Sequence, residues 1–352
     1  MPKAALPRAL RYIVFVLPLK SCRPSLLWLA LPLLAVFLSA GCRGRGRVQE
    51  IAYVSAPQAI LRDRVAAVYN KTGTVKNGDR VQILGRERRF ARVRTAAGAE
   101  GWLEQRYLTT QQVYAGFQKL AQQSQNLPVQ APGTTRNDTN LHLEPGRETE
   151  HLYQLNQGSK VSILKRETVE KTLPGAPVAE SNQSSKPVTP ILEDWWLIRD
   201  PDGHVGWVLA RMVDIDAPLE IAQYAEGQRI VAFFVLNEVS DGDKKVAQYL
   251  VLLSEPKDGL PFDYNQFRVF TWNVRKHRYE TAYRERNLNG ELPVTVSQEK
   301  FDKDGTLPVF VLRVKDDGNV SERKYKLNTP IVRRVLAPGE QPPKAIAKKR
   351  RH

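Results

Sequence analysis

The chain has 352 residues, with 53 Lys and Arg against 37 Asp and Glu, and a formal net charge of +16. Apolar residues make up 42% of the sequence, which is ordinary for a globular protein, so the length allows roughly two to four compact domains. The cysteines are Cys22 and Cys42, so the chain beyond residue 42 has no disulfide, thiol nucleophile or thiolate metal site.

Residues 1–41 have the pattern of a signal peptide. Basic residues precede an apolar run from Ser25 to Ala40, which is shorter than the roughly 20 residues that span a membrane. Small residues then lead directly to Cys42. This order resembles the lipobox of bacterial lipoproteins, which implies cleavage before Cys42 and attachment of a palmitate-type lipid to its thiol. An ordinary signal peptide or an uncleaved anchor is the alternative.

Residues 42–50 begin with "CRGRGR", which we interpret as a lipidated basic tether. Each Arg near an anionic membrane surface contributes about 1 kcal/mol of attraction. Lipoproteins kept in the inner membrane often have Asp after the cysteine, whereas this chain has Arg43. The resemblance therefore implies a lipid-anchored protein of the cell envelope, at the periplasmic face of the outer membrane where one exists. Outside the cytoplasm, the positive charge does not predict nucleic-acid binding.

An internal repeat occupies the middle of the chain, at 51–108 and 132–216. The segment 61–87 aligns with 141–167 without a gap, and 90–108 aligns with 195–213. The second copy therefore carries a 25-residue insertion near 168–192, rich in Pro, Ser, Asn and Gln, which predicts a long loop. Short alternating segments and Gly-containing turns predict a small β-barrel in each copy.

These residues resemble the bacterial SH3-like domains of cell-envelope proteins. The resemblance rests on two spaced motifs, which are "GDRVQIL" followed by "GWL" in the first copy and "GSKVSIL" followed by "GWV" in the second. It implies two SH3-like barrels that bind cell-wall peptide (peptidoglycan) or a protein partner. Between them, residues 109–131 have apolar positions at helical spacing, which predicts a linker helix packed between the barrels.

Residues 217–336 keep the β pattern but leave the repeat. About seven or eight strands are expected there, in an antiparallel meander, sandwich or small barrel. Residues 337–352 form a basic, Pro-containing tail that predicts disorder. The chain as a whole is therefore predicted to be mainly β.

The candidate binding residues are aromatic and basic. They are Phe90, Arg92, Arg94 and Tyr107 in the first copy, and Trp195 and Trp196 in the second. Adjacent strand residues face opposite ways, so one of the two tryptophans is expected in the core, and the other is expected exposed or covered by the insertion. Gly101, Trp102, Gly206 and Trp207 are expected to close the barrel cores.

No catalytic motif, cofactor motif or metal-ligand spacing emerges from the sequence. We therefore expect no metal, no cofactor and no catalysis. The leading hypothesis is a lipid-anchored binding protein of the envelope. The alternatives are a structural or assembly lipoprotein with the barrels as spacers, and a carboxylate hydrolase in the C-terminal domain.

Overall fold

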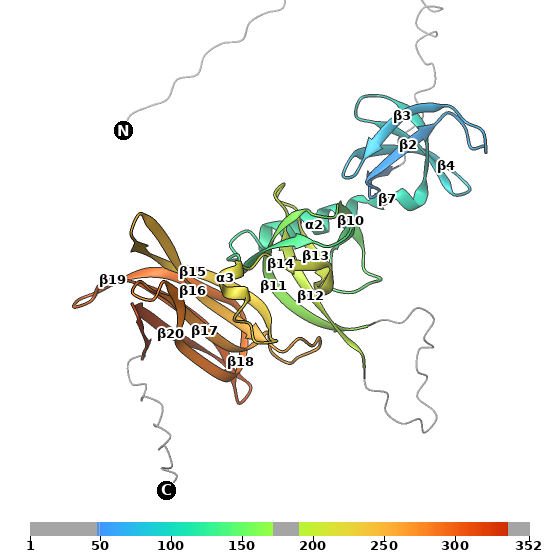
Figure 1. The fold of residues 1–352 in the computed structure, drawn as a ribbon. Coiled ribbons are helices and arrows are strands. Elements are labelled where there is room, and N and C mark those ends of the chain that lie inside the picture. The colour runs from blue at the N-terminus through green and yellow to red at the C-terminus, as the bar shows by residue number, and fades with distance from the viewer. Residues whose placement is uncertain (1–47, 49, 172–189, 337–352) are drawn as a thin grey trace, which may run out of the picture. The chain divides into compact units, whose positions relative to one another are not determined.

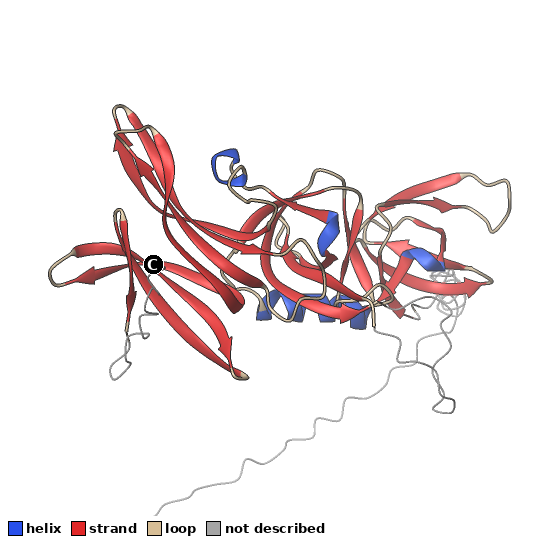
Figure 2. Cartoon of the chain, turned by 60° about the horizontal axis from the view of Figure 1, so that its bottom comes forward, coloured by secondary structure: helices blue, strands red, loops and turns tan. Residues whose placement is uncertain are grey.

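The computed structural model describes residues 48, 50–171 and 190–336, which belong to a compact unit that begins at Val48. Most of these residues lie in antiparallel strands, as Figure 2 shows in red. The predicted mainly β fold is therefore confirmed. The predicted signal peptide, Cys42 with most of its tether, the centre of the insertion and the basic tail lie outside the described residues. Among the described residues, no helix is long and apolar enough to cross a membrane.

The first copy of the repeat forms a seven-stranded sheet in the order β3-β2-β6-β5-β4-β1-β7. Its strands are β1 (Glu50–Val54), β2 (Gln58–Arg62), β3 (Lys71–Lys76), β4 (Arg80–Glu87), β5 (Phe90–Thr95), β6 (Glu100–Glu104) and β7 (Leu108–Thr110), with the short 3-10 helix η1 (Gln105–Tyr107) before β7. Apolar and polar residues alternate along β4, so Val81 and Ile83 are buried on one face of the sheet while Arg80 is exposed on the other.

The second copy forms another seven-stranded sheet, in the corresponding order β10-β9-β13-β12-β11-β8-β14. Its strands are β8 (Ala131–Thr135), β9 (Thr139–His142), β10 (His151–Leu155), β11 (Lys160–Glu170), β12 (Leu192–Arg199), β13 (Val205–Leu209) and β14 (Val213–Ile215), with η2 (Ala210–Met212) before β14. The two ends of the insertion continue the β11–β12 pairing, from Thr168 opposite Asp194 to Glu170 opposite Leu192.

The linker helix α2 (Gln111–Gln123) is capped by Thr110, whose hydroxyl accepts a hydrogen bond from the Val113 amide at 3.3 Å. Val113 and Phe117 of this helix are buried. Leu120 and Ala121 pack on a cluster of the second sheet. The apolar residues of this helix therefore pack in the core.

The C-terminal sheet is a meander in sequence order, from β15 to β21 (Figure 1). Its strands are β15 (Arg229–Asp241), β16 (Lys244–Ser254), β17 (Tyr264–Asn273), β18 (Arg278–Phe301), β19 (Gly305–Asp316), β20 (Asn319–Asn328) and β21 (Ile331–Val335), and the short helix α3 (Leu219–Ala222) precedes them. Of the predicted alternatives, the structure shows the antiparallel meander.

The hydrophobic cores differ between the sheets. The first sheet has a core of its own, which includes Leu61, Ile83 and Leu103. The second sheet shares a cluster with the C-terminal sheet, since Ile163 and Phe267 belong to the same group of buried residues. The second and C-terminal sheets are thus packed together through apolar side chains.

A buried ion-pair network reinforces this shared packing. Asp194 of β12, which is fully buried, accepts hydrogen bonds from Arg166 at 2.7 Å and from Arg229 at 3.1 Å. Arg166 also pairs with Asp263 at 3.0 Å. Burial opposes ionisation of Asp194, but the hydrogen bonds from Arg166, the Gly259 amide and Thr168, together with the charge of Arg166, outweigh it and lower the pKa of that carboxyl. Removing one side chain of this network would leave the remaining buried charges only partly compensated.

Candidate functional site

A hollow of about 450 Å³ lies on the first sheet between the β2–β3 loop and the β4–β5 turn. It is lined by Arg62, Val65, Ala66, Ala67, Arg88, Arg89 and Phe90. Phe90 is 4% exposed. The hollow therefore has an aromatic ring, a small apolar loop segment and three guanidinium groups, and none of the lining residues is a carboxylate.

Local hydrogen bonds anchor the loop that forms one wall. The Asp63 carboxylate accepts a hydrogen bond from the Asn70 amide at 2.8 Å and another from Arg64 at 2.8 Å. The bond from Arg64, followed by that from Asn70, lowers the pKa of Asp63 to about 2. The two ends of the loop are thereby tied together, and residues 65–69 project beside the sheet.

Arg62 is placed between two aromatic rings. Its Cζ lies 4.1 Å from the centroid of Tyr69 and 5.1 Å from that of Phe90, within the range of cation–π attraction. Its Nη2 also lies 3.4 Å from a carboxylate oxygen of Glu104. The rings and the carboxylate together hold the orientation of this guanidinium.

Arg88 and Arg89 form the opposite rim. Within the described residues, no carboxylate lies within 4.0 Å of either guanidinium. Arg88 has a φ of 53°, a left-handed conformation that Gly or Asn adopts more readily. The turn thus carries two cations without a carboxylate partner at the edge of the hollow, and the Arg89 Cζ lies 5.4 Å from the centroid of the Phe90 ring.

Of the residues predicted for the first copy, only Phe90 lines this hollow. Arg92 and Arg94 do not line it, because both pair with Glu100, at 3.0 and 2.7 Å. Tyr107 accepts a hydrogen bond from Arg106 at 2.7 Å and does not line the hollow. Sequence reasoning passed over Arg88 and Arg89, although two adjacent arginines immediately before the aromatic residue were visible.

A second hollow, also of about 450 Å³, occupies the equivalent place on the second sheet. The strand register proves the equivalence. In the first sheet, Phe90 lies opposite Glu87 and Arg62 lies opposite Trp102 on the neighbouring strands. In the second sheet, Trp195 lies opposite Glu167 and His142 lies opposite Trp207 in the same way. His142 and Trp195 line the second hollow as Arg62 and Phe90 line the first.

The charges of the second hollow are largely paired internally. Arg147 donates to Glu193 at 2.8 Å, and Arg211 lies 3.7 Å from the same carboxylate. The hydrogen bond from Arg147 lowers the pKa of Glu193 although burial opposes the shift. The indole Nε1 of Trp195 is buried and has no hydrogen-bond partner among the described residues. The His142 ring lies edge-on to Trp195, 5.2 Å away.

Of the two alternatives predicted for Trp195 and Trp196, exposure of one side chain is wrong, because neither is exposed. Trp195 is 2% exposed and Trp196 is 3% exposed. They face opposite ways as expected, but both faces of β12 are covered. Trp196 joins Ile198 in the cluster shared with the C-terminal sheet, and Trp195 joins Leu197 in a cluster on which residues of helix α2 pack.

The predicted core role of the Gly-Trp pairs is half right. A Cβ on Gly101 would lie 2.7 Å from Leu61 Cβ, and one on Gly206 would lie 2.7 Å from Leu141 Cβ, so both close approaches need glycine. Trp102 is wrong as a core residue, because Leu103 occupies the core and Trp102, pointing the other way, is half-buried. Trp207 is buried, but in the cluster with Trp195 rather than in the one that holds Trp196.

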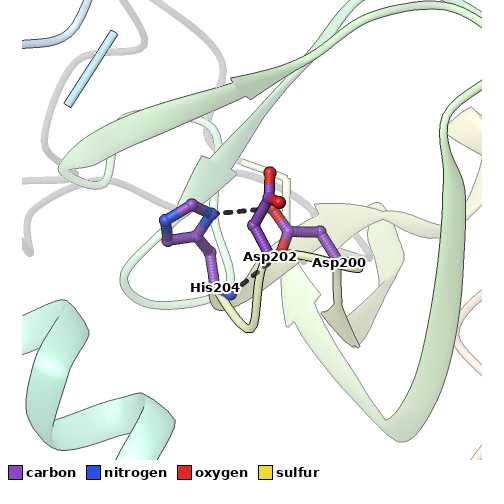
Figure 3. A group of neighbouring side chains, drawn as sticks. All are labelled: Asp200, Asp202 and His204. Atoms are coloured by element: carbon purple, nitrogen blue, oxygen red, sulfur yellow. Dashed lines mark hydrogen bonds and ion pairs between the residues drawn. The ribbon is translucent and has the colours of Figure 1, made fainter.

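Asp200, Asp202 and His204 come together in the β12–β13 turn, although no metal-ligand spacing was recognised in the sequence. Their candidate ligand atoms lie within 4.8 Å of one another (Figure 3), a donor set that can hold a divalent cation. Asp200 accepts from the His204 amide and lies 2.8 Å from its Nδ1. This hydrogen bond raises the pKa of His204.

The equivalent turn of the first sheet explains this geometry without a metal. There, Thr95 Oγ1 accepts a hydrogen bond from the Ala99 amide at 3.2 Å, in the place of Asp200 and His204. Asp200 therefore closes the turn as Thr95 does. The spacing Asp-x-Asp-x-His in a Gly turn was the signal that could have revealed the cluster.

The C-terminal sheet has a hollow of about 240 Å³ lined by Glu226, Gln228, Asn265, Gln266, Arg268, Arg286 and Asn287. Glu226 is its single lining carboxylate and pairs with Arg268 at 2.8 Å. A glycosidase-type mechanism needs two carboxylates across one site. This hollow does not provide that pair.

Comparison with known proteins adds one family. Residues 59–109 match the family described as Bacterial SH3 domain. No match is found among curated proteins. The first copy of the repeat therefore contains a bacterial SH3 domain.

Two solved structures are similar at low levels. An NlpC/P60 family protein from Bacillus cereus ATCC 10987 has 11% identity and a TM-score of 0.23, and the match covers 54% of this chain and 65% of that chain, less than two thirds of its length. NlpC2 from Trichomonas vaginalis has 12% identity and a TM-score of 0.17, over 78% of this chain and 97% of that chain.

Proposed function

We propose that this chain is a non-enzymatic, lipid-anchored protein of the cell envelope that binds cell-wall peptide through its first sheet. The proposal includes cleavage before Cys42 and retention at the periplasmic face of the outer membrane. The observation that carries it is the hollow lined by Arg62, Arg88, Arg89 and Phe90 within the segment that matches the bacterial SH3 domain. Peptidoglycan stem peptides are anionic, which complements these cations.

The second sheet is proposed to be a structural partner of the first. It has the same strand order, which supports a second SH3-like domain at 132–216. Its hollow is compensated by Glu193, its two tryptophans are buried, and it shares a core with the C-terminal sheet. These features favour a structural role, in which the second sheet is a rigid support for the first.

A structural or assembly role for the whole chain is the second candidate function. The buried network of Arg166, Asp194 and Asp263 and the shared core are the observations that favour it. In that case the first hollow would bind no wall component, and the positive surface would attract anionic polymers only diffusely.

Sedimentation with purified peptidoglycan tests the two functions. The segment 48–352, which contains the compact unit, would be compared with Ala66→Asp, which places a carboxylate in the first hollow. Ala97→Asp is the matched control, because Ala97 is also exposed but lies in the β5–β6 turn. We expect binding that survives about 0.3 M salt, where diffuse attraction is screened, and that only Ala66→Asp abolishes.

Equal loss in both variants, or loss of all binding by that salt concentration, would support the structural role instead. Circular dichroism of both variants would establish that they fold. The lipid anchor is tested separately, by mass spectrometry of the mature N-terminus and by Cys42→Ser, which should release the protein from membranes.

A further inference from the structure

The ligand of the first hollow can be defined more narrowly than cell-wall peptide. Arg88 and Arg89 have no carboxylate partner among the described residues, and Arg62 is held by two rings. Guanidinium groups at a rim without lining carboxylates attract an anion, and their planar forks suit a carboxylate. The opposite wall offers only the small apolar residues Val65, Ala66 and Ala67.

We propose that this hollow binds the free C-terminal carboxylate of a peptide that ends in a small apolar residue. Arg88 and Arg89 would hold the carboxylate, while the methyl group of the terminal residue would lie against the loop and the Phe90 ring. This inference rests on the proposed function, because it names the part of the wall peptide that the first sheet recognises.

The turn that carries the arginines supports this role. A left-handed φ at Arg88 is unfavourable for a side chain with a Cβ, so the turn itself does not explain why arginine stands there. The equivalent positions of the second sheet are Glu193 and Asp194, which pair with that sheet's own arginines. An arginine pair without such partners is thus specific to the first sheet.

The discriminating experiment compares an acid with its amide. Chemical shifts of the isotope-labelled segment 48–352 would be followed during titration with N-acetyl-alanyl-alanine and with its C-terminal amide. Because hydrogen bonds to charged groups are stronger than neutral ones, we expect the amide to bind roughly tenfold more weakly or worse. Shifts should centre on residues 62–69 and 88–90.

Paired variants test which arginines are responsible. Arg88→Gln with Arg89→Gln should remove the preference for the acid. Arg80→Gln with Arg92→Gln, which removes two exposed cations of the same sheet outside the hollow, should retain it. Equal binding of acid and amide, or no binding of either, would overturn the inference. It would leave the proposed function intact if peptidoglycan still sediments the protein in an Ala66→Asp-sensitive way.

The chirality of the peptide distinguishes the source of the carboxylate. Wall peptides end in D-alanine, whereas protein C-termini carry L-residues. Tighter binding of the D,D-peptide would support both the inference and the wall. Tighter binding of the L,L-acid would support the carboxylate inference but overturn the wall as the ligand's source.

Discussion

The first and second sheets have the same strand order but opposite charges at one equivalent place. Arg88 and Arg89 precede Phe90 in the first sheet, whereas Glu193 and Asp194 precede Trp195 in the second. In the first sheet the charges line an open hollow. In the second they neutralise Arg147 and Arg166 and help to join the sheet to its C-terminal neighbour. One scaffold thus leaves an open cationic hollow in one copy and forms a packing surface in the other.

The largest expected difference between the two sheets is the loss of stability when the buried carboxylate of Asp194 is removed. Asp194→Asn should lower the free energy of unfolding by about 3–5 kcal/mol, because the buried Arg166 would lose one of its two carboxylate partners and Arg229 would also lose a partner. Urea unfolding followed by tryptophan fluorescence measures it. Glu100→Gln, the comparison in the first sheet, removes only partly exposed ion pairs and should cost less than about 1 kcal/mol. Similar losses in both would contradict the contrast.

Gly101 and Gly206 test a close approach of strands that the two sheets have in common. Gly101→Ala and Gly206→Ala should each destabilise by about 1–3 kcal/mol, because the new Cβ would lie too close to Leu61 or Leu141. Thermal unfolding of the two variants should give shifts of similar size. A neutral result in one sheet would mean that the two close approaches are not equivalent.

Helix α2 should matter more to the second sheet than to the first. Thr110→Ala removes the cap of α2 and should cost about 1 kcal/mol. Hydrogen exchange should accelerate in α2 and in the cluster of Trp195 and Trp207, on which residues of this helix pack. Thr110→Ser, which keeps the hydroxyl, is the control. Faster exchange confined to β2–β6 would contradict this assignment.

The smallest expected effect is a pH dependence that is present in the second sheet and absent from the first, because residues 50–110 contain no histidine. Burial lowers the pKa of His142, so its contribution to stability is lost as pH falls below the unfolded value of about 6.5. The Asp200 hydrogen bond raises the pKa of His204, so that contribution is present below about 6.5 and is lost as pH rises through the folded value.

Single variants separate these two opposing contributions. His142→Asn should reduce the loss of stability of the second sheet as the pH falls below about 6.5. His204→Asn should reduce the loss of stability as the pH rises above about 6.5. Unfolding free energies between about pH 5 and pH 8 measure both. Hydrogen exchange in the first sheet should show no matching change in stability over the same range, and such a change there would contradict the difference.

Much of the fold was predictable because it depends on local pattern. Alternation in "RVQIL" and "KVSIL" predicted strands, and the repeat predicted two similar sheets. The apolar spacing in residues 109–131 predicted helix α2. The candidate site was predicted only in part, since Phe90 lines the hollow but Arg92 and Arg94 do not.

The sequence pattern alone was enough to predict the strands and the helix, because these depend on neighbours within a few residues. The repeat could be read directly by aligning the two segments. Tertiary packing decided which cations are neutralised and which tryptophans are covered. Arg94 and Arg89 look alike in the sequence, yet one lies across from Glu100 on the next strand and the other stands at an open rim. Trp195 and Trp196 are both buried because separate parts of the chain cover the two faces of β12. Such partners are distant in sequence, and only the folded chain brings them into contact.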